Sequence, residues 1–286
     1  PMAYRLHPYA HLEADLKRIA AEQIGKAIAE LRDPDADRHE AIHDARKRLK
    51  KLRGLVRLTQ TGVPRFARSE NARFRDIAKA LSGTRDRTAL IEAIDGLKQR
   101  FEGEVETQSF AVVRTALELK RDAAEAALGD TGSAVAETLG ALEKAHDAVD
   151  SFSLPAKGEA RVLRGGLRAN YARARADLDL AENSGASDAF HDLRKRIKYL
   201  SMHLKLLEPA WPEAIAPLRE EAEAAADDLG RDHDYAVLRA EMGADPESFG
   251  ALARVEGRSH LHEGVGIEAV EAGAERKGIG ADVADF

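Results

Sequence analysis

Residues 43–58 read HDARKRLKKLRGLVRL, and residues 191–206 read HDLRKRIKYLSMHLKL. The second stretch begins 191 − 43 = 148 residues after the first, and the same offset places Leu81 on Leu229 and Leu90 on Leu238. Similarity at one fixed separation indicates a duplicated structural unit. We therefore expect two helical repeats, each built around one of these stretches.

Each stretch has two faces when its residues are placed on a helix at about 100° per residue. The apolar face comprises Ala45, Leu49, Leu52 and Val56 in the first copy and Leu193, Ile197, Leu200 and Leu204 in the second. Beside it runs a basic row of His43, Arg46, Lys50, Arg53 and Arg57, repeated as His191, Arg194, Lys198 and Lys205. Like charges at this spacing repel by roughly 0.2–0.5 kcal/mol a pair. A row without acids, present twice, favours an anionic ligand over the alternative of a solvated charged face.

Composition favours an all-α protein without a disulfide framework. The chain has 286 residues, 44% hydrophobic and 33% charged but only 5% aromatic, and it contains no cysteine. No apolar run approaches the 18 or so residues of a membrane span, and no signal-peptide pattern opens the chain. These features predict a cytoplasmic protein with no membrane partner. The net charge of −6 argues against a general nucleic-acid coat.

Helical periodicity extends through the whole chain, and no alternating strand pattern is present. The predicted helices span about 8–32, 37–60, 64–81, 85–102, 104–128, 133–149, 155–182, 187–207, 212–229 and 232–241. A last stretch, 246–276, contains five internal glycines and is expected to be the least stable.

Two further basic rows flank the repeated stretches. They are Arg65, Arg68, Arg75 and Lys79 on one predicted helix, and Arg161, Arg164, Arg168 and Arg175, with Tyr171, on another. The repeat positions of the first of these rows are Glu213, Ala216, Glu223 and Asp227. We predict one basic channel formed by both repeated helices and these two rows. The alternative is that the acidic row neutralises a basic row within the molecule.

The combined pattern resembles the CHAD family of α-helical domains. The repeated His-x-x-Arg-x-x-x-Lys helix is followed by Leu-Ser-Gly-Thr-Arg-Asp at 81–86 and by Leu-Gly-Arg-Asp-His-Asp at 229–234. The resemblance covers about residues 8–275. It implies two pseudo-symmetric four-helix bundles, here 8–128 and 133–275, that bind inorganic polyphosphate and associate with polyphosphate granules. The candidate ligands of polyphosphate are all four basic rows together with Lys47 and Lys195. Ser201 departs from the pattern where Arg53 would repeat, and the glycine-rich tail also departs from it.

The chemistry of the rows suits this ligand. Arginine and lysine contact phosphate through charge-assisted hydrogen bonds, and arginine often does so with two donors at once. Protonation of His43 and His191 below about pH 6.5 would add charge and strengthen binding. The competing interpretation of these histidines is local capping or packing, because both lie near the start of a predicted helix.

The sequence also bears on three other functions. The triphosphate-hydrolysing domain of many relatives uses Glu-x-Glu-x-Lys, whereas residues 104–108 read EVETQ, so we predict no enzyme and no cofactor. Glu40 with His43, and Asp188 with His191, have the spacing of a dinuclear metal bundle, but the cations that follow would repel a divalent ion. RNA or single-stranded DNA could enter the same basic groove, although Tyr171 and Tyr199 are the only aromatic residues placed for base stacking.

Overall fold

The fold is known from a computed structural model that describes residues 4–81, 85–102, 107–128, 131–155 and 158–249. This part of the chain is helical and has no strand, which confirms the all-α prediction. Its helices are α1 (Leu12–Arg32), α2 (Arg38–Thr59), α3 (Pro64–Ala80), α4 (Arg85–Arg100), α5 (Thr107–Leu128), α6 (Thr131–Asp150), α7 (Glu159–Ser184), α8 (Ser187–Leu207), α9 (Pro212–Ala244) and α10 (Pro246–Phe249). Within the described residues no helix combines the length and hydrophobicity needed to cross a membrane.

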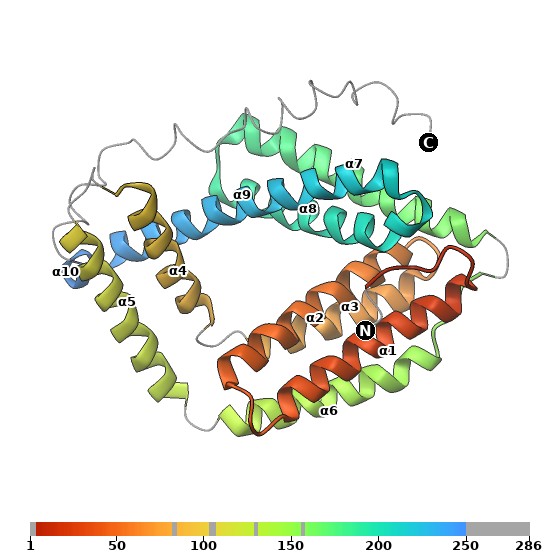
Figure 1. Cartoon of the computed structure of the whole chain (residues 1–286), viewed down its shortest axis with the longest axis horizontal. Helices are drawn as coiled ribbons and strands as arrows, with labels where there is room; N and C mark the ends of the chain where they lie inside the picture. Colours follow the sequence, from red (N-terminus) through yellow and green to blue (C-terminus); the bar gives the residue numbers. More distant parts are fainter. Residues whose placement is uncertain (1–3, 82–84, 103–106, 129–130, 156–157, 250–286) are drawn as a thin grey trace.

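The first helical group consists of α1, α2, α3 and α6 (Figure 1). Its core contains the predicted apolar face of α2, since Ala45, Leu49 and Leu52 are at most 1% exposed. Leu31 of α1, Phe74 of α3 and Leu142 of α6 complete this core, together with their neighbours. α6 follows residue 128 in the chain and yet packs on α1 and α3, so the packing crosses the boundary between the two predicted halves.

The second group consists of α7, α8 and α9, and the C-terminal part of α9 extends to a third group of α4, α5 and α10 (Figure 1). Leu193 of α8 is buried with Ala181 of α7 and Ala189. Leu238 and Met242 of α9 are buried among apolar residues of α4 and α5. α4, from the first predicted half, therefore packs on a helix of the second.

Helix boundaries repeat at the sequence offset. Adding 148 to the bounds of α1 gives 160–180, and α7 spans 159–184; adding it to α2 gives 186–207, and α8 spans 187–207. Likewise, α3 shifts to 212–228 and α4 to 233–248, which together cover nearly the whole of α9.

The single long α9 corrects the prediction of two helices separated at residues 230–231. A glycine inside a helix costs about 1 kcal/mol relative to alanine. Gly230, however, is buried against α8, where an added Cβ would lie 3.3 Å from the Arg194 guanidinium. The packing of α9 on α8 and α4 outweighs the tendency of the helix to end at Gly230.

Two helices begin several residues later than the sequence predicted. α1 begins at Leu12 rather than Pro8, because the preceding residues are held in other contacts: Leu6 N donates to the Leu206 carbonyl and His7 N to Asp15 Oδ2. α7 begins at Glu159 rather than Pro155, directly after Gly158 with φ 93°. The predicted stretch 246–276 lies mostly outside the described residues, which end at Phe249.

α2 also contacts both α7 and α8, which joins the first two groups (Figure 1). An added Cβ at Gly54 would lie 3.1 Å from the Met202 sulfur of α8, and one at Gly166 of α7 would lie 1.8 Å from the Leu58 carbonyl oxygen. The buried His203 donates from Nε2 to the Gly54 carbonyl over 2.9 Å. Small residues therefore allow three helix backbones to approach closely at the centre of the molecule.

Candidate polyanion-binding surface

The two repeated helices bring cations together where they pack. The Arg57 guanidinium of α2 lies 4.5 Å from the ring centroid of Tyr199 of α8, and that of Arg53 lies 5.9 Å from it. Tyr199 is only 8% exposed, so this ring is a support for arginines rather than a free platform for stacking a base.

The positions related by the offset also face each other. Arg57 and Tyr199 correspond to Lys205 and Lys51, since 57 + 148 = 205 and 51 + 148 = 199. Lys205 of α8 lies close enough to Lys51 of α2 to lower its pKa by repulsion. Gly54 and Met202, which contact each other, are themselves 148 residues apart. The contacts between α2 and α8 are therefore reciprocal at the offset of 148 residues.

The cations at this contact repel one another. Burial lowers the pKa of Lys51, and repulsion from Arg48, Lys205 and Lys47 lowers it further. Burial likewise lowers the pKa of Arg57, against the favourable Tyr199 contact, and Arg53 and Arg196 add to the decrease. The buried Nε of Arg57 has no hydrogen-bond partner among the described residues. An anion at this contact would relieve the repulsion.

The basic row of α2 continues onto α3. Arg46 donates to the Ala78 carbonyl over 2.7 Å, and Arg53 Nε donates to Asn71 Oδ1 over 3.3 Å. The α3 row of Arg65, Arg68, Arg75 and Lys79 is exposed beside these contacts. The structure thus joins two of the four predicted rows into one surface, together with the exposed Lys47 and Lys50.

The corresponding surface of α8 and α9 is less positive. Lys198 Nζ lies 3.4 Å from Asp227 Oδ1 of the acidic row, whereas the pair of Lys195 with Asp192 has an equivalent on α2, Lys47 with Asp44. Glu223 of the acidic row pairs instead with Arg219 of its own helix. The acidic row therefore neutralises part of the α8 row. This agrees in part with the alternative interpretation of the sequence, in which the acidic row neutralises a basic row within the molecule.

The row on α7 points away from this surface. Gly165 and Gly166 pack on α2, while Asn170 and Asp177 face α8 through hydrogen bonds with Arg196. At about 100° per residue, the four arginines lie roughly 140–180° around the helix from Gly166. All four are exposed. The structure does not bring Arg161, Arg164, Arg168 and Arg175 into one channel with α2 and α8.

Neither motif histidine caps its helix. The N-cap of α2 is Asp37, which accepts from Glu40 N, and that of α8 is Ala186. His191 stacks on His233 of α9, with ring centroids 4.0 Å apart. Burial lowers the pKa of His191 to about 4, and repulsion from His233, Lys195 and Arg194 contributes. The buried Nδ1 of His191 has no hydrogen-bond partner in the described part of the chain.

Sequence reasoning did not include Lys51, Arg196 and His233 in the site. Lys51 and Arg196 lie within the repeated stretches but outside the rows chosen by helical spacing. His233 lies in residues 229–234, the stretch that follows the second repeated helix, at the repeat position of Arg85. The repeat offered a signal for Lys51, because 51 + 148 = 199 makes it the counterpart of Tyr199, which contacts Arg57.

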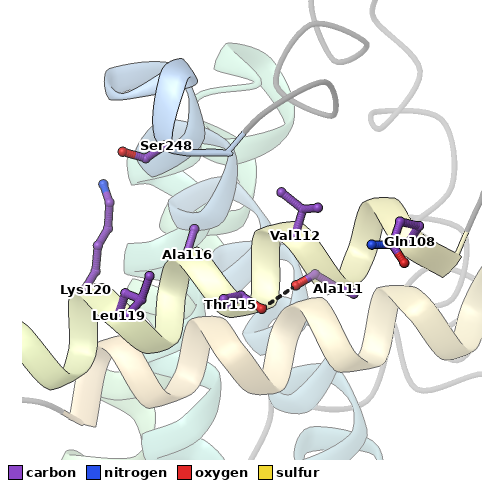
Figure 2. Close-up of a pocket in the computed structure, with 8 residues that line it drawn as sticks. All are labelled: Gln108, Ala111, Val112, Thr115, Ala116, Leu119, Lys120 and Ser248. Carbon is purple, nitrogen blue, oxygen red and sulfur yellow. Dashed lines mark hydrogen bonds between the residues drawn. The ribbon is translucent and has the colours of Figure 1, made fainter.

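A cavity of about 530 Å³ lies elsewhere, on α5 and α10 (Figure 2). Ala111, Val112, Ala116 and Leu119 make most of its lining apolar. Its one cation, Lys120, is paired with Asp245 at 3.0 Å and with Glu241. This cavity is unsuited to a polyanion.

The donor set of the dinuclear alternative is not assembled in what the structure describes. No group of three or more His, Asp or Glu side chains among those residues is arranged to hold a metal ion. Glu40 and Asp188 are exposed at the starts of their helices.

These features define an all-helical protein in which two repeated basic helices pack against each other. The family model described as the CHAD domain matches residues 9–243, and the chain therefore belongs to the CHAD family. Comparison with curated proteins found no match, and comparison with solved structures found none either.

Proposed function

We propose that this protein binds inorganic polyphosphate without hydrolysing it. The observation that carries the proposal is the packing of α2 on α8, which places Arg53 and Arg57 over the Tyr199 ring and brings Arg196 close enough to Arg57 to lower its pKa. Cations held close together destabilise the free protein, and a polyanion that contacts several of them removes this repulsion. Membership of the CHAD family supports the same ligand class.

The binding surface extends along the joined rows of α2 and α3. Arg65 and Arg68 are exposed, and no carboxylate among the described residues pairs with them. Fixed rows of guanidinium groups suit a chain of phosphates because every unit presents anionic oxygens and no base needs to be read. The α8 row contributes Arg194, Lys198 and Lys205 from the other side of the contact.

The repeat supports a pseudo-symmetric architecture. We interpret the two halves as products of an internal duplication that gave two bundles, related by a two-fold axis through the contact of Gly54 with Met202. Because the axis relates α2 to α8, it also relates their basic rows. In a cell the protein would reside in the cytoplasm at polyphosphate granules, where such a ligand is concentrated.

The decisive measurement is binding of fluorescently labelled polyphosphate at several salt concentrations. Affinity should fall steeply as salt rises, by analogy with counterion release from nucleic acids. Unlabelled polyphosphate should displace the label at far lower concentrations than RNA of matched charge. No binding, or affinity independent of salt, would reject the proposal, and preferential displacement by RNA would favour a nucleic-acid function.

The absence of catalysis needs its own assay. Polyphosphate incubated with the protein and Mg²⁺ or Mn²⁺ should keep its chain-length distribution on a gel. Shortened chains that depend on added protein, and that are lost on chelation, would show a metal-dependent enzyme instead.

A further inference from the structure

The outer face of α7 carries an arginine row that the α2–α8 contact does not use. Arg161, Arg164, Arg168 and Arg175 are all exposed, and among the described residues none has a carboxylate at ion-pair distance. From Arg161 to Arg175 the row extends along about 21 Å of helix. Many cations of the α2 row, in contrast, already contact protein groups, as Arg46 and Arg57 do.

Three of the four row positions are apolar in the related helix α1, and the fourth, that of Arg161, is Glu13. Subtracting 148 places Arg164, Arg168 and Arg175 on Leu16, Ala20 and Ala27. Those three residues pack in the apolar clusters that α1 forms with its neighbours, and Ala27 is fully buried in the cluster shared with α6. The second repeat thus has arginines where the first has core residues. A merely solvated face would accept either charge, whereas every charged residue of α7 from Arg161 to Arg175 is an arginine; the exposed acids Asp179 and Glu182 follow only after the row.

The α7 row begins beside the start of the α3 row. Thr61, in the loop between α2 and α3, donates from its hydroxyl to the Val162 carbonyl of α7 over 3.0 Å. Val63 and Phe66 pack in one apolar cluster with Val162 and Leu163. Arg65 and Arg161 adjoin these packed residues in sequence, so the two rows meet at the same end of the molecule.

We propose that the outer face of α7 is a second contact for the same polyphosphate chain, reached around this end from α3. The inference rests on the proposed function. A chain long enough to occupy the α2–α3 surface continues past Arg65 to Arg161 and along α7. Once the chain is bound to the α2–α3 surface, its contact with α7 is intramolecular. The overall affinity of the protein for a long chain then rises, although the contact with α2 and α3 is unchanged. A short chain occupies one row at a time.

The test compares long and short polyphosphate on variants of α7. In Arg161→Gln/Arg164→Gln/Arg168→Gln/Arg175→Gln, affinity for long chains should fall about tenfold or more, since the avidity of two linked contacts is lost. The dependence on salt should become shallower. Short chains titrated at saturation should show one site fewer per protein, while the remaining site keeps its affinity.

A matched control exists on the same helix. Arg173 is exposed but lies about 20° around the helix from Gly166, on the side opposite to the row. Arg168→Gln should weaken the binding of long chains more than Arg173→Gln, although both remove one exposed arginine. Thermal melts of all variants should coincide with that of the unmodified protein.

The outcomes separate the two ideas. If the unmodified protein binds neither long nor short chains, the proposed function fails. If it binds both, and the fourfold variant and Arg173→Gln behave alike, the α7 contact alone is wrong. If α7 arginines are needed for RNA but not for polyphosphate, with Tyr171 stacking a base, the ligand of this face is a nucleic acid and the inference is overturned.

Discussion

The imidazole rings of His191 and His233 stack 4.0 Å apart at an interplanar angle of 29°, with the Nδ1 atom of His191 buried. One ring comes from α8 and the other from α9, so the pair joins the repeated helix to its neighbour. Burial and nearby cations lower the pKa of both rings, that of His191 to about 4. The free protein therefore holds two neutral histidines beside Arg194, and added charge from His191 begins well below the pH 6.5 expected from sequence.

This arrangement predicts acid sensitivity. A histidine whose pKa is lower in the folded chain than in the unfolded chain stabilises the fold fully above about pH 6.5, and less as the pH falls toward 4. His203, also with a pKa of about 4, acts in the same direction. Denaturant unfolding at pH 7.5 and pH 5 should show a lower free energy of unfolding at pH 5. His191→Gln should reduce that difference, whereas His146→Gln, on the exposed face of α6, should not. Equal pH dependence in all three proteins would contradict the prediction.

Lys205 should matter for binding but not for folding. Replacing it in Lys205→Gln removes its repulsion of Lys51, so the free energy of unfolding should stay within about 0.5 kcal/mol or rise slightly. Affinity for polyphosphate should fall several-fold, and more at low salt than at high salt. Lys144→Gln, at an exposed lysine of α6, serves as the control and should leave affinity unchanged. A loss of stability without a loss of affinity would place Lys205 outside the ligand surface.

Gly166 tests the close approach of α7 to α2. A Cβ there would lie 1.8 Å from the Leu58 carbonyl oxygen, so Gly166→Ala must separate the two helix backbones. Overpacking of this kind costs about 1–3 kcal/mol or more. Gly140→Ala on α6 is the matched substitution, because nothing lies within 4 Å of its Cβ position, and it should stabilise by about 0.5–1 kcal/mol. Urea unfolding gives the free energy of unfolding of both variants. Equal changes in the two would contradict the close approach of α7 to α2.

Leu52 and Leu200 occupy equivalent positions but differ in burial. Leu52 is 1% exposed in the core shared with α1, α3 and α6, whereas Leu200 is half-buried. Leu52→Ala should cost about 2–5 kcal/mol, and Leu200→Ala clearly less. Saturating polyphosphate should restore part of the lost melting temperature in both, because it binds the folded state. Comparable losses in the two variants would show that the repeats pack alike.

Local periodicity predicted most of the helices and the buried face of α2, whereas on α8 Ile197 and Leu200 are only half-buried and Tyr199 and His203 are buried instead. Ala45, Leu49 and Leu52 recur at steps of three and four, and a helix with such a stripe must bury it. The bounds of α8 were predicted to the residue, because Gly185 and the segment after Leu207 interrupt helical geometry locally. The fixed offset of 148 also indicated which helices correspond.

The tertiary structure alone decided which surfaces meet. Charge spacing on α7 resembles that on α2, yet Gly165 and Gly166 turn the α7 arginines away from α2, because only a face without side chains lets the backbones approach. The continuity of α9 through Gly230, the position of α6 beside α1 and the contact of Arg57 with Tyr199 depend on partners far away in sequence. A single helix carries no information about such partners. The sequence by itself therefore determined the elements and their charges, and packing between distant segments determined the candidate site.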